Sequence, residues 1–123
     1  MNTVLWILQI VLALMFLMAG VQKTFFPKEK LDKQFPWAQD FGVRTVRVIG
    51  VSELAAAIGL VLPAATGILP VLTPLAAVGL VVVMALAMNV HRRRGESSAI
   101  VFNAVLLVLA AVVVWGRFGP YSF

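Results

Sequence analysis

Four long, apolar and almost uncharged stretches restrict what this chain folds into more than any other feature. The first of them, 3–22, contains no Asp, Glu, Lys or Arg. Similar stretches follow at 44–62, 70–90 and 98–116. A helix rises about 1.5 Å per residue, so about 20 residues span the roughly 30 Å hydrocarbon core of a bilayer. We therefore predict an all-α membrane protein, a bundle of four transmembrane helices that forms one domain over 1–123.

The composition excludes a soluble fold of this length. Hydrophobic residues make up 62% of the chain and charged residues 12%, whereas soluble domains hold about 45 to 50% apolar and about 25% charged residues. So few charged side chains, gathered in two short stretches, do not cover a surface that faces water. Four spans and their connections also leave no room for a soluble catalytic domain. We expect no catalytic residues of the chain's own, and non-enzymatic roles are favoured.

The chain contains no cysteine and one histidine, His91. Without thiols it has no thiolate nucleophile and no cysteine-ligated iron–sulfur or zinc site, and one histidine provides neither bis-histidine haem ligation nor a zinc site. We expect no metal site and interpret His91 as a solvated loop residue. The net charge of +5 does not indicate nucleic acid, because the basic residues lie beside hydrophobic spans, where they fit anionic lipid headgroups better.

The connection between the first two spans, 23–43, differs sharply from both. Charged residues alternate there with aromatic ones. Pro27 and Pro36 are placed to start short helices, because proline is favoured in the first turn. Leu31 with Phe35, four residues apart, would share one face of the first short helix. We predict that this segment lies along the membrane interface, with its rings at headgroup depth.

Prolines and serines suggest where the other spans begin and end. Pro63 is expected to end the second span, and Pro70 to lie in the first turn of the third. Pro74 then removes a backbone donor and is a candidate kink. Ser97 or Ser98 is expected to cap the fourth span.

The basic residues lie almost entirely on one side of the predicted bundle. Nine belong to the first and third connections or the adjoining helix ends, and only Arg117 belongs to the other side. By the positive-inside rule, both basic loops lie in the cytoplasm and both termini outside the cell membrane. The nine are Lys23, Lys28, Lys30, Lys33, Arg44, Arg47, Arg92, Arg93 and Arg94.

Glu53 is the residue that the bilayer tolerates least. It lies nine residues from Arg44 and nine from Leu62, near the middle of the second span, where an ionisable side chain costs on the order of 3 kcal/mol to insert. Its helical neighbours Gly50 and Ala57 are small, and small residues let transmembrane helices pack closely. We therefore expect Glu53 to point into the bundle.

The partners of Glu53 must come from other helices. Asn103, in the fourth span, lies at a similar depth, and its amide is able to donate to a carboxyl group. On the first span, Gln9, Gly20 and Lys23 fall along one stripe, which we expect to face Glu53, with Lys23 reaching inward from the cytoplasmic edge. Two interpretations stay open. Glu53 is either a neutral acid bonded to Asn103 for packing, or a ligand-binding or proton-linked group.

Several segments resemble the DoxX-like family of small four-helix membrane proteins. They are FLMAGVQK (16–23), RVIGVSELAAAIGLVLP (47–63), MNVHRRRGE (88–96) and the apolar fourth span, and the most specific positions are Gly20, Lys23, Gly50, Glu53, Gly59 and Pro63. Members of that family include a membrane subunit linked to thiosulfate and quinone oxidation and a subunit grouped with superoxide and thiol detoxification enzymes, and distant relatives assemble receptors or bind sterols. Because these roles differ, the resemblance implies a scaffold rather than one reaction or a set of catalytic residues.

Three functions are compatible with these features. The first is a non-catalytic scaffold or accessory subunit, with a protein partner or a homo-oligomer in the membrane. The second is a quinone-binding subunit of an oxidoreductase, and the third is a lipid-binding or chaperone-like protein. Glu53, Lys23, Asn103 and Gln9 are the candidate ligand-binding or proton-linked residues. The candidates for cytoplasmic docking or for contacts with lipid headgroups are Arg92, Arg93, Arg94, Lys28, Lys30 and Lys33.

Overall fold

The computed structural model describes residues 2–35 and 41–122, and within these ranges the chain forms five helices and no strand. They are α1 (Asn2–Phe25), α2 (Lys28–Gln34), α3 (Val43–Thr66), α4 (Leu72–Arg94) and α5 (Ser97–Phe118). All but α2 are long and apolar enough to cross a membrane. The prediction of an all-α bundle with four membrane spans is confirmed.

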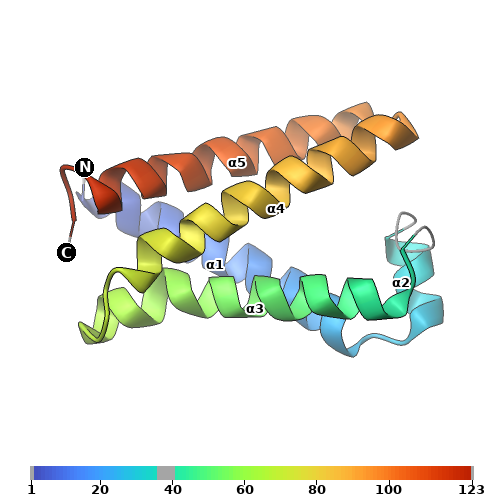
Figure 1. Ribbon diagram of the computed structural model, residues 1–123, viewed down its shortest axis with the longest axis horizontal. Coiled ribbons are helices and arrows are strands. Elements are labelled where there is room, and N and C mark those ends of the chain that lie inside the picture. Colours follow the sequence, from blue (N-terminus) through green and yellow to red (C-terminus); the bar gives the residue numbers. More distant parts are fainter. Residues whose placement is uncertain (1, 36–40, 123) are drawn as a thin grey trace.

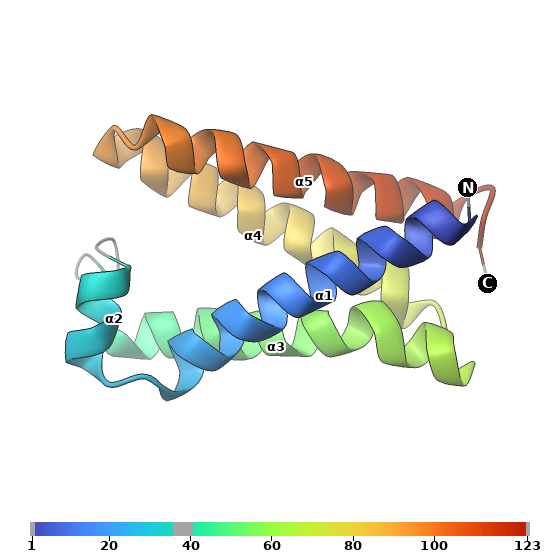
Figure 2. The same cartoon turned by 180° about the vertical axis from the view of Figure 1, so that it is seen from behind.

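The four spans are arranged as two pairs, α1 with α3 and α4 with α5 (Figure 1). The pairs meet at the end of the bundle that holds both termini, and they diverge toward the end that holds α2 and the turn between α4 and α5 (Figure 2). One buried core joins all four spans and includes Leu12, Leu60, Leu80 and Ala110.

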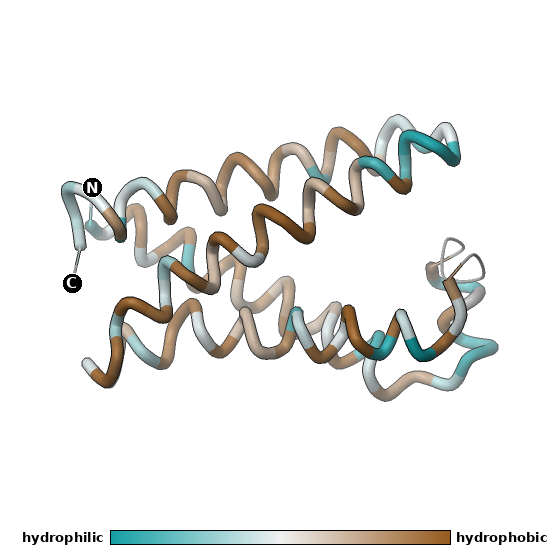
Figure 3. Tube along the Cα trace, viewed as in Figure 1, coloured by the Kyte–Doolittle hydropathy of each residue, from teal (hydrophilic) through white to brown (hydrophobic). Residues whose placement is uncertain are grey.

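The outer surface of the bundle is apolar, as a lipid solvent requires. Large hydrophobic side chains are exposed on every span, among them Leu14, Ile58, Leu86 and Val105. Hydrophilic residues gather instead at α2 and at the turn between α4 and α5 (Figure 3). This distribution fits a protein whose sides face hydrocarbon and whose ends face water.

α2 occupies the segment predicted to lie at the interface, and it begins directly after Pro27. Leu31 is buried against Val46 of α3, with Phe26 and Phe35 packed beside them. This shared face anchors α2 to the end of the bundle. The second short helix, predicted to start at Pro36, lies outside the described residues.

Several helix ends differ from the prediction. α3 continues past Pro63 to Thr66, because the proline removes only one donor and Gly67, at φ 73°, closes the helix by donating its N–H to the Pro63 carbonyl. α4 begins at Leu72, not at the predicted position two residues earlier. Pro74 therefore lies in its first turn, where the missing N–H would have no acceptor within the helix, and no kink is needed.

The predicted serine cap of the fourth span is wrong. Ser97 is the first residue of α5, and Glu96 stands at the N-cap position without a side-chain capping bond. The Glu96 carboxylate instead accepts hydrogen bonds from His91 and Arg94. These contacts tie the acid to α4 rather than to the first turn of α5.

Candidate functional site

Two glycines let α1 and α3 approach closely enough to bring Lys23 beside Glu53. A Cβ atom on Gly20 would lie 2.8 Å from the Gly50 carbonyl oxygen, and one on Gly50 would lie 2.8 Å from the Thr24 amide nitrogen. Side chains do not tolerate such contacts with backbone, so only glycine fits at this crossing. Lys23 follows Gly20, and Glu53 follows Gly50, by three residues, so each charge lies on the same face of its helix as the glycine.

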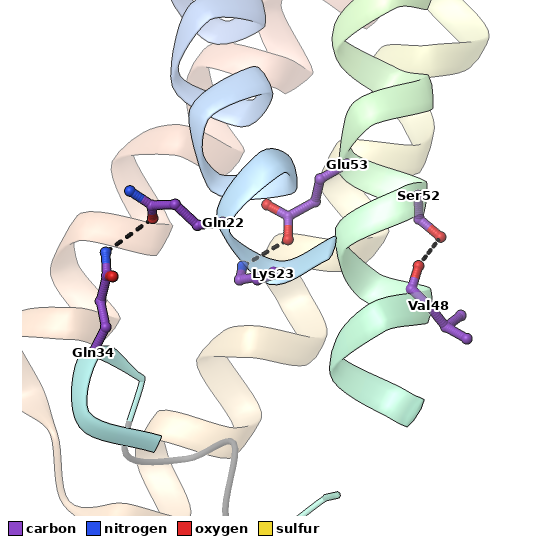
Figure 4. Close-up of polar contacts among 6 residues, drawn as sticks. All are labelled: Gln22, Lys23, Gln34, Val48, Ser52 and Glu53. Atoms are coloured by element: carbon purple, nitrogen blue, oxygen red, sulfur yellow. Dashed lines mark hydrogen bonds and ion pairs between the residues drawn. The ribbon is translucent and has the colours of Figure 1, made fainter. Parts of the chain in front are cut away.

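Lys23 and Glu53 form an ion pair inside the bundle. Lys23 Nζ donates to Glu53 Oε1 at 2.6 Å (Figure 4), and the two side chains are 13% and 1% exposed. The ammonium also lies 5.2 Å from the centroid of the Phe35 ring, within reach of a cation–π contact. Arg47 Nη1 donates to the Lys23 carbonyl at 3.1 Å. Both the side chain and the backbone carbonyl of Lys23 therefore form hydrogen bonds with residues of α3.

A cavity of about 690 Å³ lies between the two helix pairs at the end that holds α2. Its volume falls within the roughly 300 to 1,000 Å³ that small-molecule sites occupy. All four spans contribute to its wall, and Lys23 and Glu53 are part of it. Apolar residues make up most of the rest, including Met15, Phe16, Ile49, Val83, Met84, Ala87, Phe102 and Leu106. The cavity thus combines an apolar wall with a few polar groups.

Asn103 contributes to this cavity from α5 and is 7% exposed. Within residues 2–35 and 41–122, its side-chain amide has no hydrogen-bond partner, and neither has Oε2 of Glu53. The predicted bond between Asn103 and Glu53 is therefore absent, because Lys23 is the partner that the carboxylate finds. Both side chains form part of the cavity wall, so their polar atoms are available to the polar part of a ligand.

His91 and Glu96 form the rim of the cavity where α4 turns into α5. His91 Nδ1 lies 2.9 Å from Glu96 Oε1, and Arg94 Nε donates to the same oxygen at 3.1 Å. The hydrogen bond from His91, together with the nearby positive charge of Arg94, holds the pKa of the Glu96 carboxyl below its usual range. The interpretation of His91 as a solvated loop residue is wrong, since it belongs to the last turn of α4 and only 15% of its side chain is exposed.

Gln9 lies in a different polar cluster, near the end of the bundle that holds the termini. Its Nε2 donates to the Leu60 carbonyl at 2.7 Å, and its Oε1 accepts from Arg117 Nε at 2.7 Å. Arg117 also donates to Asn2 Oδ1 and to the Tyr121 carbonyl. Gln9 is thus separated from the cavity, whereas Glu53, Lys23 and Asn103 are brought together in it.

The burial of Arg117, which is 3% exposed, was not predicted from the sequence. Its position near the end of the fourth span suggested a solvated charge. Gln9 was the signal that pointed to it, because an amide inside an otherwise uncharged span needs a polar partner at the same depth. The cluster joins α1, α3 and α5 by hydrogen bonds, and we interpret it as a structural contact that stabilises the packing of these helices.

The remaining basic candidates lie on the surface at the cavity end of the bundle. Arg92, Arg93 and Arg94 are exposed at the end of α4, and Arg93 also borders the cavity. Lys28, Lys30 and Lys33 are exposed on α2, where Lys30 Nζ lies 4.2 Å from the centroid of the Phe26 ring. The positive charge therefore gathers at the same end of the bundle as the cavity, and Arg93 is part of the cavity wall.

Comparison with known proteins identifies the family. A family model described as the DoxX-like family matches residues 7–113 of the chain. No curated protein and no solved structure matches it at a significant level. The match runs through all four spans and includes Lys23, Glu53 and Asn103. The chain therefore belongs to the DoxX-like family and is a small multi-pass membrane protein.

Proposed function

We propose that this member of the DoxX-like family binds a small amphipathic molecule from the membrane in the cavity between its two helix pairs. The observation that carries the proposal is a largely apolar cavity of about 690 Å³ whose wall holds the Lys23–Glu53 ion pair and Asn103. Apolar walls with a few convergent polar groups are typical of small-molecule sites.

A purely structural role for Glu53 explains less of the site. A carboxylate kept only to join α1 and α3 would need contact with these two helices alone, whereas Glu53 also forms part of the wall of the cavity. Lys23 fills one oxygen of Glu53, and Asn103 contributes its amide to the same cavity. The hydrogen-bonding groups of Glu53 and Asn103 in the cavity wall favour ligand binding over a role in packing alone.

Quinones and lipids both combine an apolar body with a polar head, and both suit this cavity. A role as the quinone-binding subunit of an oxidoreductase requires that a partner supply electrons, because the chain has no cysteine and the described residues contain no metal-binding cluster. In that role, Glu53→Gln abolishes quinone-dependent turnover of the complex while the complex still assembles. Unchanged turnover in this variant removes the quinone role and leaves lipid binding.

The binding proposal is tested on protein purified from its native membrane in mild detergent. Native mass spectrometry of the wild type should show a retained small molecule. Ala87→Phe, which fills the cavity, should lose that molecule, whereas the same substitution at Ala85, which is exposed on the outer face of α4, should keep it. A ligand-free wild type, or equal retention by both variants, contradicts the proposal.

A second candidate role is that of a scaffold or accessory subunit in a membrane complex. The exposed arginines at the end of α4 favour it, because three adjacent cations suit an acidic surface on a partner. Replacing Arg92, Arg93 and Arg94 by glutamine should then release a specific protein that co-purifies with the wild type. Recovery of the wild type as a partner-free homomer at its natural expression level argues against this role.

A further inference from the structure

We infer that the bound molecule is an amphipathic anion, whose carboxylate or phosphate head is bound by Arg93 at the rim of the cavity and whose hydrocarbon chain lies against the apolar wall of α4. This inference rests on the proposed function and adds the charge and the chemical class of the ligand. Two properties of the cavity wall support it, the balance of its charges and the order of polar and apolar residues along α4.

The charges of the cavity wall balance except at Arg93. Lys23 pairs with Glu53 at 2.6 Å. The Glu96 carboxylate accepts a hydrogen bond from Arg94 Nε at 3.1 Å, so its charge is compensated as well. In the part of the chain that the structure describes, Arg93 is the one remaining Asp, Glu, Lys or Arg of the wall, and no hydrogen bond, ion pair or ring contact engages it. The wall therefore carries one positive charge, and an anion is its complement.

Polar and apolar residues follow one another along the α4 wall in the order that an amphipathic molecule requires. The α4 residues of the wall run from Val83 to Arg93, a distance of about 15 Å at the rise of a helix. The polar ones all belong to the last two turns of α4 and are Asn89, His91 and Arg93. Those that precede them are apolar and are Val83, Met84, Leu86 and Ala87. A head group at Arg93 therefore lets its chain extend along apolar surface toward Met84, which belongs to the buried core.

An arginine at the membrane interface suits the heads of acidic amphipathic molecules. Its planar guanidinium matches the oxygens of a carboxylate or a phosphate with paired hydrogen bonds. The orientation predicted from the basic residues places Arg93 at the cytoplasmic leaflet, which is the leaflet that carries anionic lipids. The cavity volume of about 690 Å³ lies in the range of small-molecule sites and suits one hydrocarbon chain. Fatty acids and single-chain phosphate esters share this chemistry.

Probes with the same hydrocarbon tail test the inference. Delipidated protein in phosphatidylcholine nanodiscs is titrated with dodecanoate, dodecyl phosphate and dodecanol, and occupancy is read by native mass spectrometry. Each probe is compared between the wild type and Arg93→Gln, because its own partitioning into lipid then cancels. The substitution should weaken the binding of both anions about tenfold, the effect of losing a hydrogen bond to a charged group, and should leave the binding of dodecanol unchanged. Unchanged binding of both anions overturns the inference.

Arg92→Gln is the matched control. It removes the same charge from the same end of α4, but Arg92 donates to Asn89 Oδ1 at 3.2 Å and lies outside the cavity wall that the structure describes. Both arginines are exposed, so neither substitution disturbs the core. Arg92→Gln should retain the anions as the wild type does. Equal weakening in the two variants would show a general attraction to the basic end of the bundle and would overturn the assignment to Arg93.

Ala87→Phe separates this inference from the proposed function on which it rests. If this variant loses dodecanol but Arg93→Gln affects neither anion, the cavity binds amphipathic molecules and the anionic head is wrong. If anion binding depends on Arg93 yet survives in Ala87→Phe, the anion lies on the surface of the bundle and the inference fails. If no probe binds at all, both fail. Dodecanoate and dodecyl phosphate distinguish the two sources of the charge. Binding of either one that depends on Arg93 and is lost in Ala87→Phe supports the inference, and failure of both contradicts it.

Discussion

Lys23 and Glu53 show how a charged pair is kept inside a membrane bundle. Each charge alone would be expensive at this depth, and their separation of 2.6 Å lets each stabilise the other. The pair depends on Gly20 and Gly50, because a side chain at either position would push α1 and α3 apart. At the scale of single residues, the site thus depends on two glycines, which let the helices approach, and on two charged side chains, which pair with each other.

The mutual dependence of the pair gives the first prediction. Lys23→Met leaves Glu53 buried without its partner and should lower the free energy of unfolding by about 3 kcal/mol. The double variant Lys23→Met, Glu53→Met removes both charges and should lie within about 1 kcal/mol of the wild type, since an apolar pair often replaces a buried ion pair without loss. Unfolding in denaturing detergent measures both values. Additive losses in the double variant would show that the two side chains do not interact.

At the scale of helices, close contact between α1 and α3 is the feature that fixes the site. Gly50→Ala places a methyl group 2.8 Å from the Thr24 nitrogen and should lower the midpoint of unfolding and reduce ligand retention. Gly79→Ala is the matched control, because nothing lies within 4 Å of a Cβ atom at that position on α4. It should be neutral or stabilise the protein by up to about 1 kcal/mol, since alanine favours helix more than glycine does. Equal effects of the two substitutions would contradict the importance of the crossing.

The turn between α4 and α5 should respond to acid. The pKa of Glu96 is lower in the folded protein than its ordinary value of 4.5, chiefly through the hydrogen bond from His91. Its contribution to stability is therefore complete above that value and is lost as the pH falls through the lower folded value. The difference in melting temperature between the wild type and Glu96→Gln should shrink between pH 7 and about pH 3. A difference that does not change with pH would exclude this role.

How far the sequence predicts the structure also depends on the element considered. The spans were predictable because hydrocarbon tolerates only long apolar helices, and the pairing of Lys23 with Glu53 was partly predictable because buried charges need partners. The continuation of α3 past Pro63 and the hydrogen bond between Gln9 and Arg117 were not predictable. Both depend on which helix faces lie together, and a sequence without three-dimensional contacts does not specify that.

At the scale of the whole molecule, the charges predict the orientation in the membrane. With nine of ten basic residues at the cavity end, the positive-inside rule places α2 and the turn between α4 and α5 in the cytoplasm and both termini outside. Because the chain contains no cysteine, single cysteines test this directly. A membrane-impermeant thiol reagent added to intact cells should label Ser122→Cys and leave Ser98→Cys unlabelled. The reverse pattern would invert the topology.

Binding in the cavity between the helix pairs is the central claim, and methionine methyl groups test it most directly. Met15 and Met84 line the cavity, whereas Met18 is 65% exposed on the outer face of the same helix as Met15. In carbon-13 methyl NMR spectra of the protein in nanodiscs, titration with dodecanol should shift the Met15 and Met84 signals in a saturable way and leave the Met18 signal in place. Uniform shifts of all three signals, or no shift at Met15 and Met84, would contradict a binding site between the helix pairs.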